Sequence, residues 1–178
     1  MTTSLFPCYN RSMKKTSVII CCCLLALICP VVSVSAISEG QKNSIIDNCE
    51  KIKDSLKNVQ KLDSKARVFL GSHFETVYSK YITTLNVRLV ENNLSKTNLI
   101  NNQSEYATAK VTFVNDYISY QQGLEDLVAM DCRAEPEGFY NKLTSVREKR
   151  KKMVSDVSAL KSLASKNVKF VTELKESL

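Results

Sequence analysis

The chain is short of the residues that interrupt helices or build catalytic sites. It holds no Trp, one His, three Pro and four Gly in 178 residues, and no Asn-Gly or Asp-Gly pair marks a tight hairpin. Strand signals are therefore missing, which favours long helices. The single His73 has no nucleophile placed beside it by local spacing, and no glycine-rich phosphate loop or paired-carboxylate signature occurs. We therefore expect a protein that is not an enzyme.

Acidic residues are absent from residues 1–36. There a positive start at Met13-Lys14-Lys15 precedes an almost wholly apolar stretch and the small-residue site Val34-Ser35-Ala36. This order predicts a signal peptide that is cut between Ala36 and Ile37. Residues 1–12 add nothing to such a signal, so we interpret them as an N-terminal extension upstream of a true start at Met13.

The alternative interpretation keeps residues 18–36 as an uncleaved anchor, because their length approaches the roughly 20 residues that span a bilayer. Pro30 and two serines weaken its second half as a membrane helix. We therefore expect an exported protein, secreted or at the cell envelope. In the alternative, the helical domain is anchored by residues 18–36 and lies outside.

Only Cys49 and Cys132 of the seven cysteines lie beyond the predicted signal. An even pair in an exported chain predicts a disulfide, and the alternative is two free thiols. Two cysteines and His73 cannot fill a tetrahedral metal site. We therefore expect no metal and no cofactor.

The predicted mature chain, residues 37–178, has 22 basic and 18 acidic residues, a net charge of +4. This balance is too weak to name a partner, and export argues against nucleic acid. The strongest cluster joins five cations around Glu148: Arg147, Lys149, Arg150, Lys151 and Lys152. They are a candidate contact for an anionic surface, although on a helix they splay around the circumference. Arg150 falls on the apolar seam itself, where it is expected to pair with a carboxylate of a facing helix.

Apolar residues recur with helical spacing over most of residues 45–178. In the first stretch the pattern runs through Phe74, Val77, Tyr81 and Leu85, and an asparagine-rich segment at 92–102 then predicts the main loop. A second helix reaches Cys132, and a third covers 137–176 with the spacing of a coiled coil. We predict one all-α domain over 37–178, an antiparallel three-helix coiled-coil bundle. The alternative is a four-helix bundle with a break near 63–71, where Asp63-Ser64 would cap a new helix.

Several local strings occur together, among them Asn48-Cys49, Asp131-Cys132, Pro136-Glu137-Gly138-Phe139-Tyr140 and Val146-Arg147-Glu148-Lys149-Arg150. Together they resemble a group of exported helical proteins from small-genome candidate-phylum bacteria of the Saccharibacteria type. The likeness covers most of residues 48–150. It implies a setting outside the cytosol and supplies no site.

The functional expectation is a non-catalytic helical protein that acts by macromolecular contact at the cell envelope. Its partner would be a protein or an anionic envelope surface, with a membrane involved only if the signal segment is retained, and a homo-oligomer stays open. One alternative is a holdase chaperone of the periplasmic type. Another is a secreted helical-bundle inhibitor of an enzyme.

Overall fold

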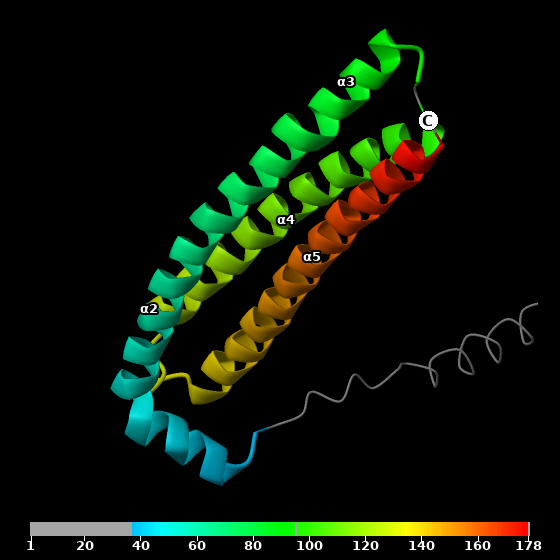
Figure 1. Cartoon of the computed structure of the whole chain (residues 1–178). Coiled ribbons are helices and arrows are strands. Elements are labelled where there is room, and N and C mark those ends of the chain that lie inside the picture. The colour runs from blue at the N-terminus through cyan, green and yellow to red at the C-terminus, as the bar shows by residue number, and fades with distance from the viewer. Residues whose placement is uncertain (1–36, 95, 178) are drawn as a thin grey trace, which may run out of the picture. The chain divides into compact units, whose positions relative to one another are not determined.

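The regular structure of the chain is helical throughout the residues that the computed structural model describes, 37–94 and 96–177. The helices are α2 (Glu39–Thr76), the π-helix η1 (Val77–Thr83), α3 (Thr84–Glu91), α4 (Thr97–Ala129) and α5 (Pro136–Glu176). Because α2, η1 and α3 follow one another without a gap, they form one continuous helical rod, called the first rod below, whose first turns, in blue, bend away from the axis of the rest (Figure 1). The predicted all-α fold with three long helical rods is confirmed, and no β-strand occurs in the described part.

The three rods are joined by two short connections. In Figure 1, α4 runs back beside the first rod, and α5 then runs back beside α4. Pro136 opens α5 at a position that needs no backbone N–H, and its fixed φ suits a helix start. Packing is uneven, because α4 and α5 are in close contact along their lengths, whereas each touches the first rod more sparsely.

The predicted alternative of a helix break near 63–71 is wrong, because α2 is continuous through that stretch. Asp63 and Ser64 do not cap a new helix. Asp63 instead accepts a 2.7 Å hydrogen bond from the Tyr120 hydroxyl, and Ser64 lies 3.3 Å from the Tyr117 hydroxyl, both on α4. The side chains of Asp63 and Ser64 therefore contact α4 and do not cap a helix, and the backbone of α2 stays helical through both residues.

The first rod contains a π-helix that the apolar pattern did not reveal. The pattern placed Tyr81 on the packed face, but Tyr81 is 65% exposed and the neighbouring Ile82 is buried. A π-helix bonds i to i+5 and so takes in an extra residue, which shifts the buried face by one position. The prediction for Tyr81 was therefore wrong, and burial passes from Phe74 to Ile82 and Leu89.

The connection between the first rod and α4 is shorter than predicted, because α4 already begins at Thr97. Asn93 has a φ of 56° and lies just beyond the end of α3. The N–H of Leu94 donates to the Leu89 carbonyl at 2.8 Å, and that of Asn93 to the Val90 carbonyl at 3.1 Å. This is a Schellman end, in which asparagine takes the left-handed position that is usually glycine.

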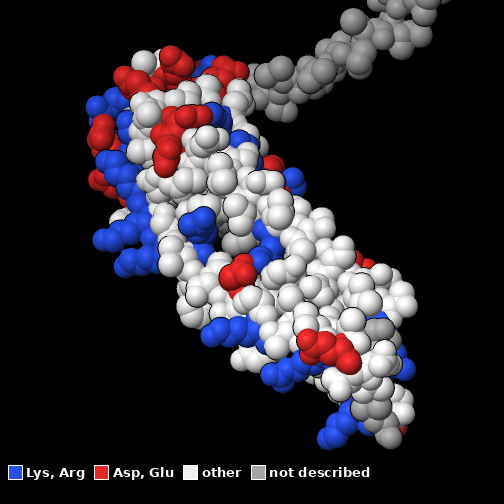
Figure 2. All heavy atoms as spheres, turned by 90° about the horizontal axis from the view of Figure 1, so that it is seen from above, with Lys and Arg blue, Asp and Glu red and all other residues white. Residues whose placement is uncertain are grey.

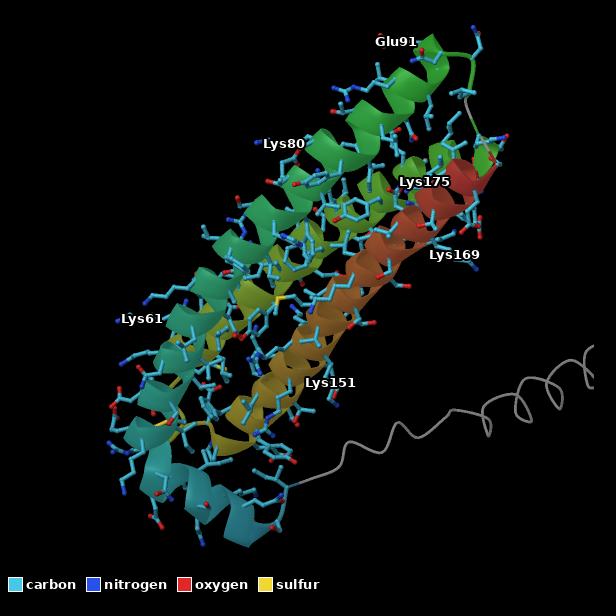
Figure 3. All side chains as sticks on the ribbon, viewed as in Figure 1. Lys61, Lys80, Glu91, Lys151, Lys169 and Lys175 are labelled. Atoms are coloured by element: carbon cyan, nitrogen blue, oxygen red, sulfur yellow. A yellow bond between two sulfur atoms is a disulfide. The ribbon has the colours of Figure 1, made fainter. Side chains whose placement is uncertain are left out.

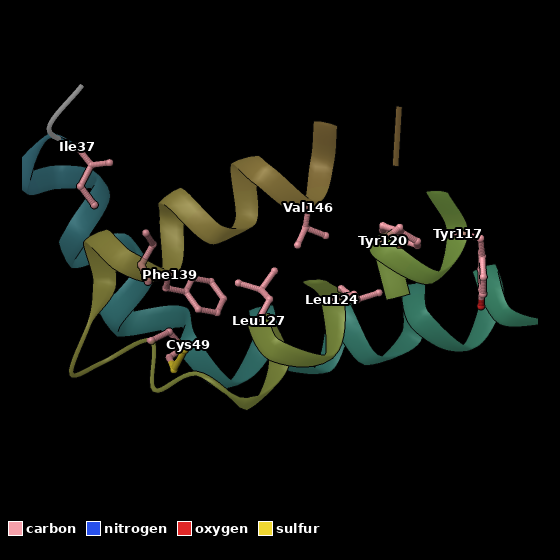
Figure 4. Close-up of a cluster of buried hydrophobic side chains, with 10 residues drawn as sticks. Ile37, Cys49, Tyr117, Tyr120, Leu124, Leu127, Phe139 and Val146 are labelled. Atoms are coloured by element: carbon pink, nitrogen blue, oxygen red, sulfur yellow. A yellow bond between two sulfur atoms is a disulfide. The ribbon is translucent and has the colours of Figure 1, made fainter. Parts of the chain in front are cut away.

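The buried side chains form three clusters along the bundle. The largest, shown in Figure 4, lies where α5 begins and contains Cys49, Leu127 and Phe139 among its ten buried residues. A middle cluster surrounds Phe74 and Leu160. The smallest, at the far end, has three buried residues, which are Leu89, Leu99 and Leu174. Packing therefore weakens from the end with the cysteines towards the turn at Asn93.

Candidate functional site

Cys49 and Cys132 form a disulfide, as the sequence predicted. Their Cα atoms are 5.7 Å apart, and the link joins α2 to the segment between α4 and α5 across 83 residues. Both residues are buried beside Phe139, which shields the bond from solvent. A buried disulfide with this geometry holds the end of the bundle together and is not placed to act as an exposed redox pair.

The five predicted surface cations do not lie on one face. Lys149 donates to the Ser119 carbonyl at 3.1 Å, and Lys152 pairs with Asp116 at 2.9 Å, both on α4. Lys151 pairs with Glu148 on its own helix, and it points away from the bundle (Figure 3). Figure 2 shows acidic side chains most densely at one end of the molecule, with separate ones further along, and basic side chains along its length.

Arg150 makes a two-pronged contact with Asp63 on the first rod. Its Nε and Nη2 lie 2.8 and 2.9 Å from the two carboxylate oxygens, which confirms the expected pairing across the seam. Burial alone would raise the pKa of Asp63, but the hydrogen bonds from Arg150 and Tyr120 outweigh it and lower that pKa. Burial and the Asp63 hydrogen bond raise the pKa of Tyr120, so its hydroxyl stays protonated. The trio is a fixed polar link between the first rod, α4 and α5.

Two carboxyl groups, Asp116 of α4 and Asp156 of α5, lie next to each other between these helices. Burial, and then the hydrogen bond with Asp116, raise the pKa of Asp156 above its ordinary 3.8. The same Asp116 raises the pKa of Lys152 through its hydrogen bond and charge. The lone His73 is exposed on the first rod, away from this pair. Within the described residues, no group of three or more His, Cys, Asp and Glu side chains could hold a metal ion.

A groove runs between α2 and α5, where the first rod packs sparsely. One hollow of about 280 Å³ lies between Ile52, Leu56 and Val59 of α2 and Leu143 and Arg147 of α5. A second, of about 570 Å³, is lined by residues of α5 alone and shares Arg147 with the first. The lining of this second hollow runs from Tyr140 to Val154 of α5. We call the two adjoining hollows the α2–α5 groove.

The α2–α5 groove has an apolar floor and a positive rim. Lys51, Arg147, Arg150 and Lys151 line it against the single acid Glu148. Two of these cations are neutralised, Arg150 by Asp63 and Lys151 by Glu148. Lys51 and Arg147 have no carboxylate within 4.0 Å among residues 37–94 and 96–177, and they lie on opposite walls. The groove can therefore attract a ligand that is both apolar and negatively charged.

Sequence reasoning missed three buried asparagines, one on each rod. Asn86 donates to the Leu99 carbonyl at 3.1 Å and to Gln103 at 2.7 Å, and Asn102 donates to the Leu163 carbonyl at 3.3 Å. Asn167 is also buried, and its side-chain nitrogen has no partner. A signal was present, because Asn167 lies seven residues from both Leu160 and Leu174, which is the coiled-coil repeat.

The predicted cleavage site falls at the edge of the described structure. Ala36, the proposed anchor 18–36 and the proposed start at Met13 lie outside the described residues. Ile37, which would follow the cut, is buried in the cluster around Phe139. In the part of the chain that is described, no helix is both long and apolar enough to cross a membrane.

Comparison with known proteins finds no matching family, no matching curated protein and no matching solved structure. We therefore infer a function from the geometry of the chain itself.

Proposed function

We propose that this chain is an exported, non-catalytic helical protein that acts by contact with another macromolecule at the cell envelope. The α2–α5 groove is the observation that carries the proposal. It is an accessible apolar surface with two uncompensated cations, Lys51 and Arg147, on facing walls. Such a surface suits recognition of another macromolecule.

We propose further that the bundle is an antiparallel coiled coil. The seam positions of α5 at 139, 146, 153, 160, 167 and 174 repeat every seven residues, and all of them are buried or half-buried. Arg150 lies between two of these positions and binds Asp63 of the first rod. A polar pair on such a seam fixes the register of the helices, which supports this packing mode.

Export is supported by the disulfide. A bond across 83 residues persists in oxidising compartments and is rare in the reducing cytosol. The five other cysteines all fall within residues 1–36, so the predicted mature chain has no unpaired thiol. This distribution fits a protein that folds after it has crossed a membrane.

The test combines cell fractionation with cross-linking. A photo-reactive residue at Thr144, in the groove, is expected to cross-link to a macromolecule of the envelope fraction. The same residue at the exposed Asn115 of α4 is the matched control and is expected to give little. Mass spectrometry of the unreduced product is expected to show an N-terminus at Ile37 and the Cys49–Cys132 link. Recovery of the intact chain in the cytosol with both thiols alkylatable would contradict the proposal.

A holdase chaperone is the second candidate, because large apolar side chains are exposed on the first rod. Leu62, Val68 and Phe69 are each more than 60% exposed. A holdase binds many unfolded clients through such scattered apolar surface. It would suppress client aggregation regardless of the charge at Arg147, whereas contact through the groove depends on that charge.

A further inference from the structure

The floor of the α2–α5 groove consists of seam residues that the bundle leaves incompletely covered. Ile52, Leu56, Val59 and Leu143 have the spacing of core positions, yet all four are only half-buried. A fully packed bundle would bury these side chains, as α4 and α5 do with Leu124 and Leu127. The floor is therefore apolar surface for which the chain supplies no complete cover among its described residues.

The apolar surface extends beyond the floor on both walls. On α2, Leu62 and Phe69 follow Val59 by three and ten residues, which places them on the same side of the helix. They are 64% and 72% exposed. On α5, Val154 ends the lining and is 54% exposed. The stretch Tyr140 to Val154 is about 21 Å long at the helical rise, or about four turns.

We propose that the α2–α5 groove binds an amphipathic helix with acidic flanks that belongs to a partner protein. Such a helix would lie along α5 with its apolar stripe on Leu56 and Leu143, and its carboxylates would reach Lys51 and Arg147. It would add a fourth helix to the bundle, which is the recognised helix-in-groove mode. This inference rests on the proposed function and names the class of partner.

The charges and the apolar floor of the groove argue against two other occupants, a second copy of this chain and an anionic membrane. A second copy of this chain would bring another Lys51 and Arg147 to the same face, and like charges oppose that pairing. A flat anionic membrane would reach the rim cations but would leave the apolar floor between two helices uncovered. An acidic amphipathic helix satisfies the rim and the floor together.

The experiment measures binding of a defined peptide to the purified, oxidised protein by fluorescence anisotropy. The probe is a fluorescein-labelled helix of about 18 residues built from Leu, Ala and Glu, with one apolar stripe flanked by Glu. One control peptide has Lys in place of Glu, and another has the same composition with the Leu residues scattered. Saturable binding of the first peptide alone is expected, weakened by added salt because screening reduces the attraction.

Variants of the protein locate the contact. Arg147→Glu is expected to weaken binding about tenfold or more, because it replaces an attraction by a repulsion. Lys61→Glu is the matched control: it makes the same charge change on α2 at a side chain that lines neither hollow and points away from the bundle (Figure 3), and it should change binding less than about twofold. Val59→Ser tests the floor and should also weaken binding. Circular dichroism checks that each variant keeps its helices, and Lys51→Glu replaces Arg147→Glu if the latter unfolds.

Several outcomes would overturn the inference. Failure of the acidic peptide to bind, or equal binding by Arg147→Glu, would remove the acidic helix as the occupant. A dimer in sedimentation that Arg147→Glu disrupts would assign the face to a second copy. Binding of anionic phospholipid vesicles without peptide binding would assign it to a membrane. If cross-links from Thr144 to an envelope macromolecule persist in any of these cases, the proposed function stands and only its partner class is lost.

Discussion

The two ends of the bundle are held together by different means. The end around Cys49, Cys132 and Phe139, called the disulfide end, has a covalent link and the largest buried cluster. The opposite end, at the turn of Asn93 and called the apex end, has three buried leucines and the nearby asparagines 86, 102 and 167. Three asparagine atoms there have no hydrogen-bond partner: Asn86 Oδ1, Asn102 Oδ1 and Asn167 Nδ2.

This difference separates stability from specificity within one fold. At the disulfide end the apolar contacts stabilise without being directional, and the covalent link aligns α2 with the segment between α4 and α5 at one point. Buried amides at the other end are costly unless they are hydrogen-bonded. Any shift of the helices that breaks the hydrogen bonds from Asn86 to Leu99 and Gln103 therefore costs free energy. We infer that the disulfide end contributes most of the stability, and that the apex end adds alignment to that supplied by the Arg150–Asp63 pair.

Removing the disulfide should have the largest effect. Replacing Cys49 and Cys132 together by Ser is expected to lower the free energy of unfolding by about 4 kcal/mol, because an 83-residue loop is released in the unfolded chain. Urea denaturation measures this change. Hydrogen exchange should show the disulfide end losing its protection relative to the apex end. A loss below about 1 kcal/mol would contradict the contrast drawn between the two ends.

Asp63→Ala should have the next largest effect, a loss of about 2 kcal/mol, because the Tyr120 hydroxyl and the Arg150 guanidinium lose their common acceptor. Arg150 is half exposed, so solvent compensates part of the lost ion pair. Thermal denaturation measures the change. Asp54→Ala is the matched control, since Asp54 pairs only with Lys57 at the surface and should cost about 0.5 kcal/mol or less.

The effect of Asp63→Ala should also depend on pH. The folded pKa of Asp63 lies below its ordinary 3.8, so its contribution is fully present above the unfolded pKa. It is lost as the pH falls through the lower folded pKa. The difference in stability between the protein and the variant should therefore be constant near neutral pH and shrink in acid. A constant difference down to strong acid would show that the carboxylate charge is not what stabilises the link.

A matched pair of substitutions tests the apex end. Asn167→Leu is expected to raise the free energy of unfolding by about 1 kcal/mol, because it removes a buried nitrogen without a partner. Asn86→Leu is expected to lower it by a similar amount, about 1 kcal/mol, because the Leu99 carbonyl and Gln103 lose their donor. Urea denaturation of both variants gives the comparison. Equal effects of the same sign would mean that hydrogen bonding does not distinguish the two positions.

Asp156→Asn should have the smallest effect. Because the folded pKa of Asp156 is raised, the native state binds more protons than the unfolded chain, and stability falls as the pH rises from about 3.8 through the folded pKa. The variant lacks this loss, so it should be more stable near neutral pH by a few tenths of a kcal/mol after screening. The gain should vanish in acid. Denaturation at several pH values checks it, and Asp47→Asn, at an exposed site, is the control.

Part of the candidate site was predictable from local patterns. The partners Cys49 and Cys132 followed from counting cysteines beyond the apolar segment, and the pairing of Arg150 followed from a charge on an apolar seam. The identity of its partner, Asp63, did not follow, because the same residue also fitted a helix cap. Choosing between cap and cross-helix pair needs the position of Tyr120 on another helix, and no local spacing contains that information.

The α2–α5 groove was not predictable for a related reason. Leu56 and Leu143 fit the seam of their own helices as well as fully buried residues do, so the pattern predicted core. Whether a seam residue is covered depends on how closely the neighbouring helix approaches. The directions in which the five cations of α5 point were also not predictable, because they depend on contacts with other helices. One example is the hydrogen bond from Lys149 to the Ser119 carbonyl of α4.

The amino-acid sequence by itself determined the helical class, the extent of α5 and the pairing of the two cysteines, because these depend on periodicity, on the scarcity of Pro and Gly and on simple counting. Tertiary structure decided the π-helix that buries Ile82 in place of Tyr81, the continuity of α2 through Asp63, and the open face between α2 and α5. Each of these depends on which residues of distant segments meet, and contacts between segments outweigh the weak local preferences of the backbone.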